Sequence, residues 1–117
     1  MDKKILYMKG NLMLNQISVV ESLEEQLGKE LRDACSKSRR YVGQKSLRVL
    51  SLLDAYGAVE TVKKLVKRNT VNDWFVDLIL NGKVKLTMEH IICKDKYRVL
   101  FDDELRAVAL RKITFGR

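Results

Sequence analysis

The 117-residue chain contains no proline and only six glycines. A β-sandwich or β-barrel joins many short strands through turns that favour these two residues, so the composition argues against such folds. The runs between the glycines are rich in Leu, Lys, Glu, Arg and Ala, which are good helix formers. The sequence therefore predicts helices joined by short turns that glycine marks.

Cysteine and long apolar runs are also scarce. Cys35 and Cys93 are too few for a disulfide framework, which indicates reduced thiols. No run approaches the roughly 18 apolar residues of a membrane span. Lys9 and Asn11 interrupt the amino-terminal segment, whereas a signal peptide has a continuous apolar core. We expect a soluble cytoplasmic protein without a membrane partner.

Motifs for catalysis are missing as well, since neither type of glycine-rich phosphate loop occurs. The single histidine, His90, stands three residues before Cys93, but a zinc site or a Cys–His nucleophile needs further ligands or an orienting group. A metal-dependent nuclease would need acids from separate elements to converge beside a base. The candidates for such a set are Asp73, Asp77 and Glu89 with Lys85. No pattern indicates that they converge, so we expect no enzymatic activity, no metal and no other cofactor.

Apolar periodicity instead predicts an all-α fold, a compact bundle of five or six short helices in one domain over residues 21–117. Residues 1–20 are expected to form an irregular or short-strand arm. Ser22 and Glu25 have the spacing of a capping box, which predicts that the first helix begins there. Further helices are expected over about 44–56 and 58–68, from Thr70 or Asn72 to Gly82, after the cap Thr87, and after the cap Asp102.

The order of these features resembles a group of small helical bacterial proteins without an established activity. The resemblance spans about residues 22–116. Its features, in order, are an aromatic residue followed by a leucine-rich helix that ends at glycine, a helix that contains aromatic residues, a Leu-Thr-x-Glu segment and a final helix that begins with acidic residues. The matching residues are Tyr41, Leu47, Gly57, Val59, Trp74, Phe75 and Leu78, with "GKVKLTMEHII" at 82–92, "KYRVLF" at 96–101 and "DDELRAVALRKI" at 102–113. At Lys85 this chain departs from an acidic position of the pattern. The resemblance implies the helical fold and no activity.

The charge is strongly uneven along the chain. The net charge is +8 in total, and residues 1–36 hold five Lys or Arg against six Asp or Glu, while residues 37–117 hold eighteen against nine. Such a field attracts nucleic acid, anionic membrane or an acidic protein surface. The basic residues that we predict to contact a partner are Arg39, Arg40, Lys45, Arg48, Lys63, Lys64, Lys67 and Arg68. A third cluster consists of Lys83, Lys85, Lys94, Lys96 and Arg98.

The stretch "DAYGAVETVKKLVKR" at 54–68 invites comparison with a helix-turn-helix motif, in which a second helix enters the major groove. After Gly57, however, the inward apolar positions begin one residue too early for that motif. The outer face also offers lysines rather than Asn, Gln or Ser, so it would contact phosphates and would not read bases.

These observations predict a non-enzymatic binding module that engages nucleic acid or a nucleoprotein through phosphate contacts, in a phage, a mobile element or a defence system. The alternative is a protein-directed inhibitor or adaptor, such as a phage-encoded anti-CRISPR-type blocker of a host nuclease. It would use the same basic face on an acidic protein surface, or the apolar residues of the amino-terminal arm. Those apolar residues are Met1, Met8, Leu12, Met13 and Leu14.

Overall fold

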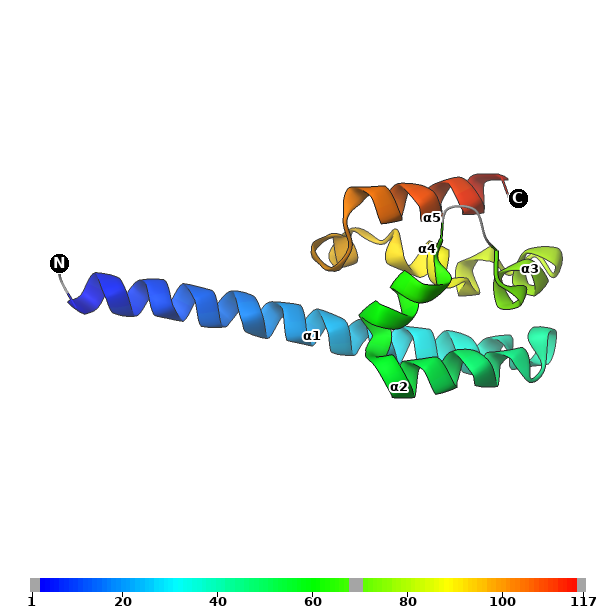
Figure 1. Ribbon diagram of the computed structural model, residues 1–117, viewed down its shortest axis with the longest axis horizontal. Coiled ribbons are helices and arrows are strands. Elements are labelled where there is room, and N and C mark those ends of the chain that lie inside the picture. The colour runs from blue at the N-terminus through cyan, green and yellow to red at the C-terminus, as the bar shows by residue number, and fades with distance from the viewer. Residues whose placement is uncertain (1–2, 68–70, 116–117) are drawn as a thin grey trace.

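The computed structural model describes the backbone of residues 3–67 and 71–115, and the side chains of this part from residue 18 onward (Figure 1). The described residues form helices and no β-strand, so the predicted all-α class is confirmed. The elements are α1 Lys3–Val42, α2 Lys45–Leu65, α3 Asp73–Leu80, the 3-10 helix η1 Val84–Leu86, α4 Met88–Ile92, the 3-10 helix η2 Asp95–Leu100 and α5 Asp103–Phe115.

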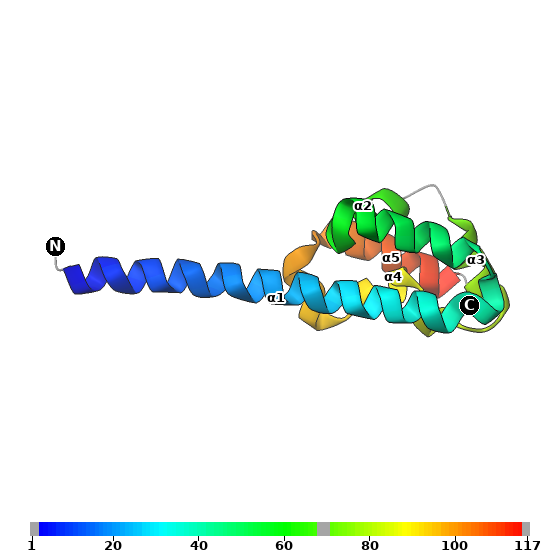
Figure 2. The same cartoon turned by 90° about the horizontal axis from the view of Figure 1, so that it is seen from below.

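Helix α1 corrects the expectation for residues 1–20, because residues 3–20 are helical and continue without a break to Val42. Ser22 therefore lies inside the helix and does not cap it. The segment has no proline, and a glycine inside a helix costs only about 1 kcal/mol, which good helix formers on either side outweigh. The amino-terminal half of α1 extends away from the other helices in two perpendicular views (Figures 1 and 2). The expected boundary between the arm and the helical domain, near residue 20, falls inside α1.

Two glycines with positive φ shape the next part of the chain. Gly43, at φ 61°, lies in the turn that sends α2 back along α1 (Figure 2). Gly57, at φ 80° and ψ 172°, interrupts α2 between residues 45–56 and 58–65. The prediction that one helix stops at Gly57 and another starts directly after it is confirmed.

The core forms where α1 and α2 meet the shorter helices. Leu27 and Leu31 of α1 are fully buried, and Val49 and Leu53 are the buried apolar side chains of the first half of α2. The carboxy-terminal part closes the core with large side chains. These are Trp74, Leu78, Met88, Ile92, Tyr97 and Phe101.

Side-chain caps fix the starts of the later helices as predicted. Asn72 Oδ1 accepts a hydrogen bond from Phe75 N at 2.8 Å, and Asp102 Oδ1 accepts one from Leu105 N at 2.8 Å. Thr87 Oγ1 accepts one from His90 N at 3.2 Å. Thr70, the other candidate cap, lies outside the described residues.

Candidate nucleic-acid interface

A hollow of about 350 Å³ lies between the two halves of α2 and the start of α3. We call it the basic hollow, because four of its lining residues are cations from two separate predicted clusters. The lining comprises Lys45, Arg48, Val49, Leu52, Lys64, Leu65, Lys67, Val71, Asn72, Asp73 and Trp74.

The break at Gly57 brings the two basic clusters together. On a straight helix, Lys45 and Lys64 would be about 28 Å apart along the axis, at 1.5 Å per residue. Both line the same hollow because the second half of α2 turns at Gly57, with its positive φ (Figure 1). A glycine that sequence reasoning assigned as a helix stop therefore positions the candidate site.

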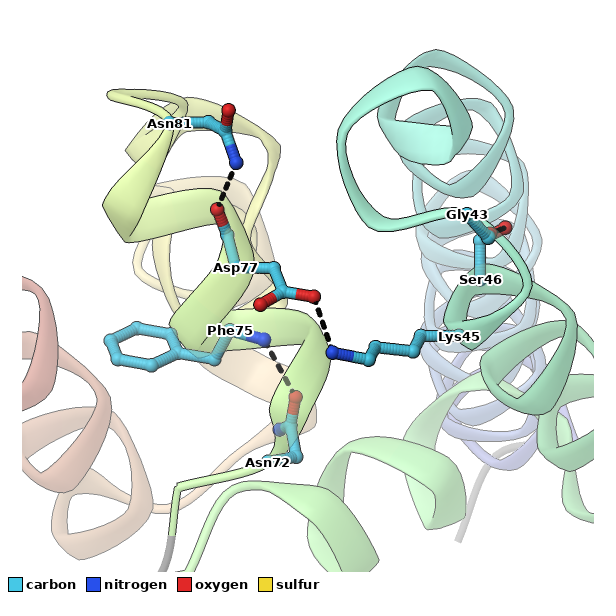
Figure 3. A network of polar contacts seen from close by, with 7 residues as sticks. All are labelled: Gly43, Lys45, Ser46, Asn72, Phe75, Asp77 and Asn81. Carbon is cyan, nitrogen blue, oxygen red and sulfur yellow. Dashed lines mark hydrogen bonds and ion pairs between the residues drawn. The ribbon is translucent and has the colours of Figure 1, made fainter.

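The cations of the basic hollow differ in their surroundings. Lys45 Nζ forms an ion pair with Asp77 Oδ2 of α3 at 2.6 Å, and this hydrogen bond raises the pKa of Lys45 (Figure 3). Lys64 Nζ lies 4.4 Å from the ring centroid of Tyr56, a cation–π contact. Arg48 and Lys67 form no ion pair with any described residue. Three of the four cations are thus not neutralised by an acid within the described part of the chain.

The basic hollow also has an apolar part, which we call its floor and which consists of Val49, Leu52, Leu65, Val71 and Trp74; the polar residues Asn72 and Asp73 complete the lining. Val49 and Trp74 are buried there, Leu52 and Leu65 are half-buried, and Val71 is 55% exposed. The indole of Trp74 donates a 2.8 Å hydrogen bond to Ser38 Oγ, so its polar atom is satisfied inside the domain.

The other predicted contact residues do not join the basic hollow. Arg40 lines a second hollow of about 500 Å³ with Ser36, Lys37, Tyr41, Lys83 and Leu86. In it, Arg40 and Lys83 lie 5.5 and 5.2 Å from the centroid of the Tyr41 ring. Arg39 is exposed and lines neither hollow. Lys63 forms an ion pair with Glu60 at 3.7 Å, and Arg68 lies outside the described residues.

Acids neutralise much of the third basic cluster. Glu30 of α1 forms ion pairs with Lys94 and with Lys96, the latter at 3.1 Å, and accepts a 2.6 Å hydrogen bond from the Tyr97 hydroxyl. Burial alone would raise the pKa of Glu30, but these three donors lower it. Arg98 pairs with Asp95. Sequence reasoning missed the role of Glu30, since its partners follow more than 60 residues later.

Other kinds of site find no support in the described residues. No three His, Cys, Asp or Glu side chains of this part lie close enough together to hold a metal ion. Glu89, considered for a nuclease site, is fully buried, whereas Asp77 pairs with Lys45. No helix of the described chain has both the length and the apolar character needed to cross a membrane. The side chains of residues 3–17, including the candidate contacts Met8 and Met13, lie outside what the structure describes, as does Met1.

No family model, no curated protein and no solved structure matches the chain. The resemblance to small helical bacterial proteins therefore stays a prediction, and a functional conclusion depends on the geometry of the basic hollow.

Proposed function

We propose that the protein is a non-enzymatic module that binds nucleic acid through backbone phosphates at the basic hollow. One observation carries this proposal. Lys45, Arg48, Lys64 and Lys67 come from two separate stretches of sequence, line one concave site, and include three cations without an acidic partner among the described residues. Cations on a concave wall attract polyanions, and phosphate oxygens are the usual partners of Lys and Arg in such sites.

The contrast with the third basic cluster supports a role beyond solubility. There, Lys94 and Lys96 both form ion pairs with Glu30, so one carboxylate offsets part of their charge within the domain. Four cations and one acid, Asp73, line the basic hollow, and Arg48 and Lys67 form no ion pair with a described residue. Like charges gathered in this way repel one another, and a bound polyanion would offset that repulsion and release its own counterions.

Charge reversal tests the proposal. The variant Arg48→Glu/Lys64→Glu/Lys67→Glu changes three cations of the basic hollow. The matched control, Lys29→Glu/Lys85→Glu/Arg111→Glu, makes the same change in net charge at exposed cations that line neither hollow. Binding of labelled DNA and RNA is measured by fluorescence anisotropy at about 50 and 200 mM salt, a range over which phosphate contacts weaken steeply.

The hollow variant should lose most of its affinity, and the slope of log affinity against log salt should fall by about 1 for each phosphate contact removed. The control should keep that slope and lose only a small part of its affinity to long-range charge. An unmodified protein that binds no nucleic acid at about 50 mM salt, or equal losses in both variants, would overturn the proposal.

A further inference from the structure

The apolar floor of the basic hollow points to a narrower class of ligand than nucleic acid in general. We infer that the basic hollow takes one unpaired nucleotide of a single strand, with its phosphate on the cations and its base on the floor. This inference rests on the proposed function and adds the strandedness of the partner.

Phosphate binding alone requires cations on a surface and gives no reason for an apolar hollow beneath them. In the basic hollow, Leu52 and Leu65 are half-buried and Val71 is 55% exposed, and they share the lining with Lys64 and Lys67. A flat ring that covers these side chains removes their apolar surface from water, which favours binding. A nucleotide combines an anionic phosphate with a flat, weakly hydrated base, which suits both parts of the site.

A hollow that takes an inserted base should distinguish single strands from duplexes. In a duplex the bases are stacked and paired, so only phosphates, sugars and groove edges reach a protein surface. A single strand can turn a base outward and insert it, as single-strand binders require. The hollow has a volume of about 350 Å³. This lies at the small end of the range for ligand sites, about 300–1,000 Å³, and suits a single nucleotide.

An exposed aromatic ring lies beside one cation of the hollow. Tyr56 is 53% exposed, and its ring is in contact with the ammonium of Lys64. A base that neighbours the inserted nucleotide can stack on this ring, because such stacking tolerates any base. Trp74, which is 2% exposed and hydrogen-bonded to Ser38, is the buried part of the floor and is not a stacking surface.

The test compares a single strand with its own duplex. Labelled oligo-dT and oligo-U of about 20 residues, longer than the sites of about 4–16 nucleotides that single-strand binders cover, are titrated alone and after pairing with complementary strands. We expect at least one single strand to bind about tenfold more tightly than its duplex. The two single strands also show whether DNA or RNA is preferred.

Two variants that change no charge separate the contribution of the floor to binding from that of the cations. Val71→Ser changes an exposed side chain that contributes little to packing, and Leu52→Gln changes a half-buried one. Each should weaken single-strand binding about fivefold or more and leave duplex binding and the salt slope unchanged. Leu80→Gln, at a residue that is 78% exposed and outside the hollow, is the control. Thermal melting monitored by circular dichroism checks that the variants fold.

Failure of this inference and failure of the proposed function give different results. If no nucleic acid binds, the proposed function fails and this inference with it. If single strand and duplex bind equally, or the duplex binds more tightly, the inference is overturned while phosphate binding stands. Unchanged single-strand affinity in folded Val71→Ser and Leu52→Gln overturns it as well.

Discussion

Trp74 of α3 donates a 2.8 Å hydrogen bond from Nε1 to Ser38 Oγ of α1 in the interior of the domain. The two residues are 2% and 0% exposed. The Ser38 hydroxyl in turn donates to the Cys35 carbonyl oxygen at 3.1 Å, so it accepts one hydrogen bond and donates another. This contact fixes the start of α3, and with it one wall of the basic hollow, to the longest helix.

Removal of this acceptor should destabilise the protein. Ser38→Ala leaves the indole N–H buried without a partner, which should lower the free energy of unfolding by about 1–3 kcal/mol. Urea denaturation followed by circular dichroism measures the change, and Ser51→Ala on an exposed face of α2 is the control. In the background of Trp74→Phe, which has no N–H, Ser38→Ala should cost less. Equal costs in the two backgrounds would show that the hydrogen bond contributes nothing.

The kink of α2 provides a second prediction. Gly57, at φ 80° and ψ 172°, occupies a region that essentially only glycine adopts. A Cβ at this position would meet no atom within 4 Å, so backbone strain is the main cost of Gly57→Ala. We expect this variant to lose about 1–3 kcal/mol of stability in urea denaturation. It should also bind nucleic acid more weakly, because a straighter α2 moves Lys64 away from Lys45.

Gly43→Ala is the matched control for the kink. Gly43 also has a positive φ, 61°, and open space around its Cα, but it lies in the turn between α1 and α2 and lines neither hollow. The Gly43→Ala variant should be less stable than the unmodified protein and should bind nucleic acid with unchanged affinity. Equal affinities of the two variants would mean that the kink does not position the site.

Much of the fold could be predicted because its signals are local. The caps Asn72, Thr87 and Asp102 each accept a backbone hydrogen bond from a residue three positions later, so a short stretch of sequence contains the whole interaction. The secondary structure of the amino-terminal arm was predicted incorrectly for the same reason. Apolar runs in residues 3–20 fit strand and helix equally, and the choice depends on continuity with the rest of α1.

The candidate site could be predicted only as a set of cations. Lys45 and Lys64 line the same hollow because of the backbone direction at Gly57. The pairing of Lys94 with Glu30 depends on how distant helices pack. Side-chain spacing along one helix does not contain this information.

A buried carboxyl makes stability depend on pH. Glu89 of α4 is 0% exposed, and burial raises its pKa from 4.5 to about 7. Its own backbone amide and the nearby Lys112 act in the opposite direction without outweighing burial. The folded protein therefore binds one more proton than the unfolded chain between these two values. The stability that Glu89 contributes is fully present below about pH 4.5 and is lost as the pH rises to about 7.

The variant Glu89→Gln removes this dependence, because its amide does not titrate. Its free energy of unfolding relative to the unmodified protein should rise by about 3 kcal/mol between about pH 5 and pH 8. Glu30, whose pKa is lowered, changes stability only below this window. Urea denaturation at several pH values measures the difference, with Glu104→Gln on the exposed first turn of α5 as the control. Parallel pH profiles for Glu89→Gln and the unmodified protein would contradict the expectation.

The ion pair between Lys45 and Asp77 predicts a variant that binds more tightly. Lys45 Nζ lies 2.6 Å from Asp77 Oδ2, so a phosphate that reaches the basic hollow must compete with this carboxylate (Figure 3). Asp77→Asn releases the ammonium and removes a negative charge beside the site. Its affinity for nucleic acid should rise about two- to fivefold, and the salt slope should increase by up to about 1. Because the pair is partly exposed, its loss should change stability little. Asp95→Asn frees Arg98 outside both hollows by the same chemical change. Anisotropy titrations that show the same gain for both variants would assign the effect to net charge and remove Lys45 from the site.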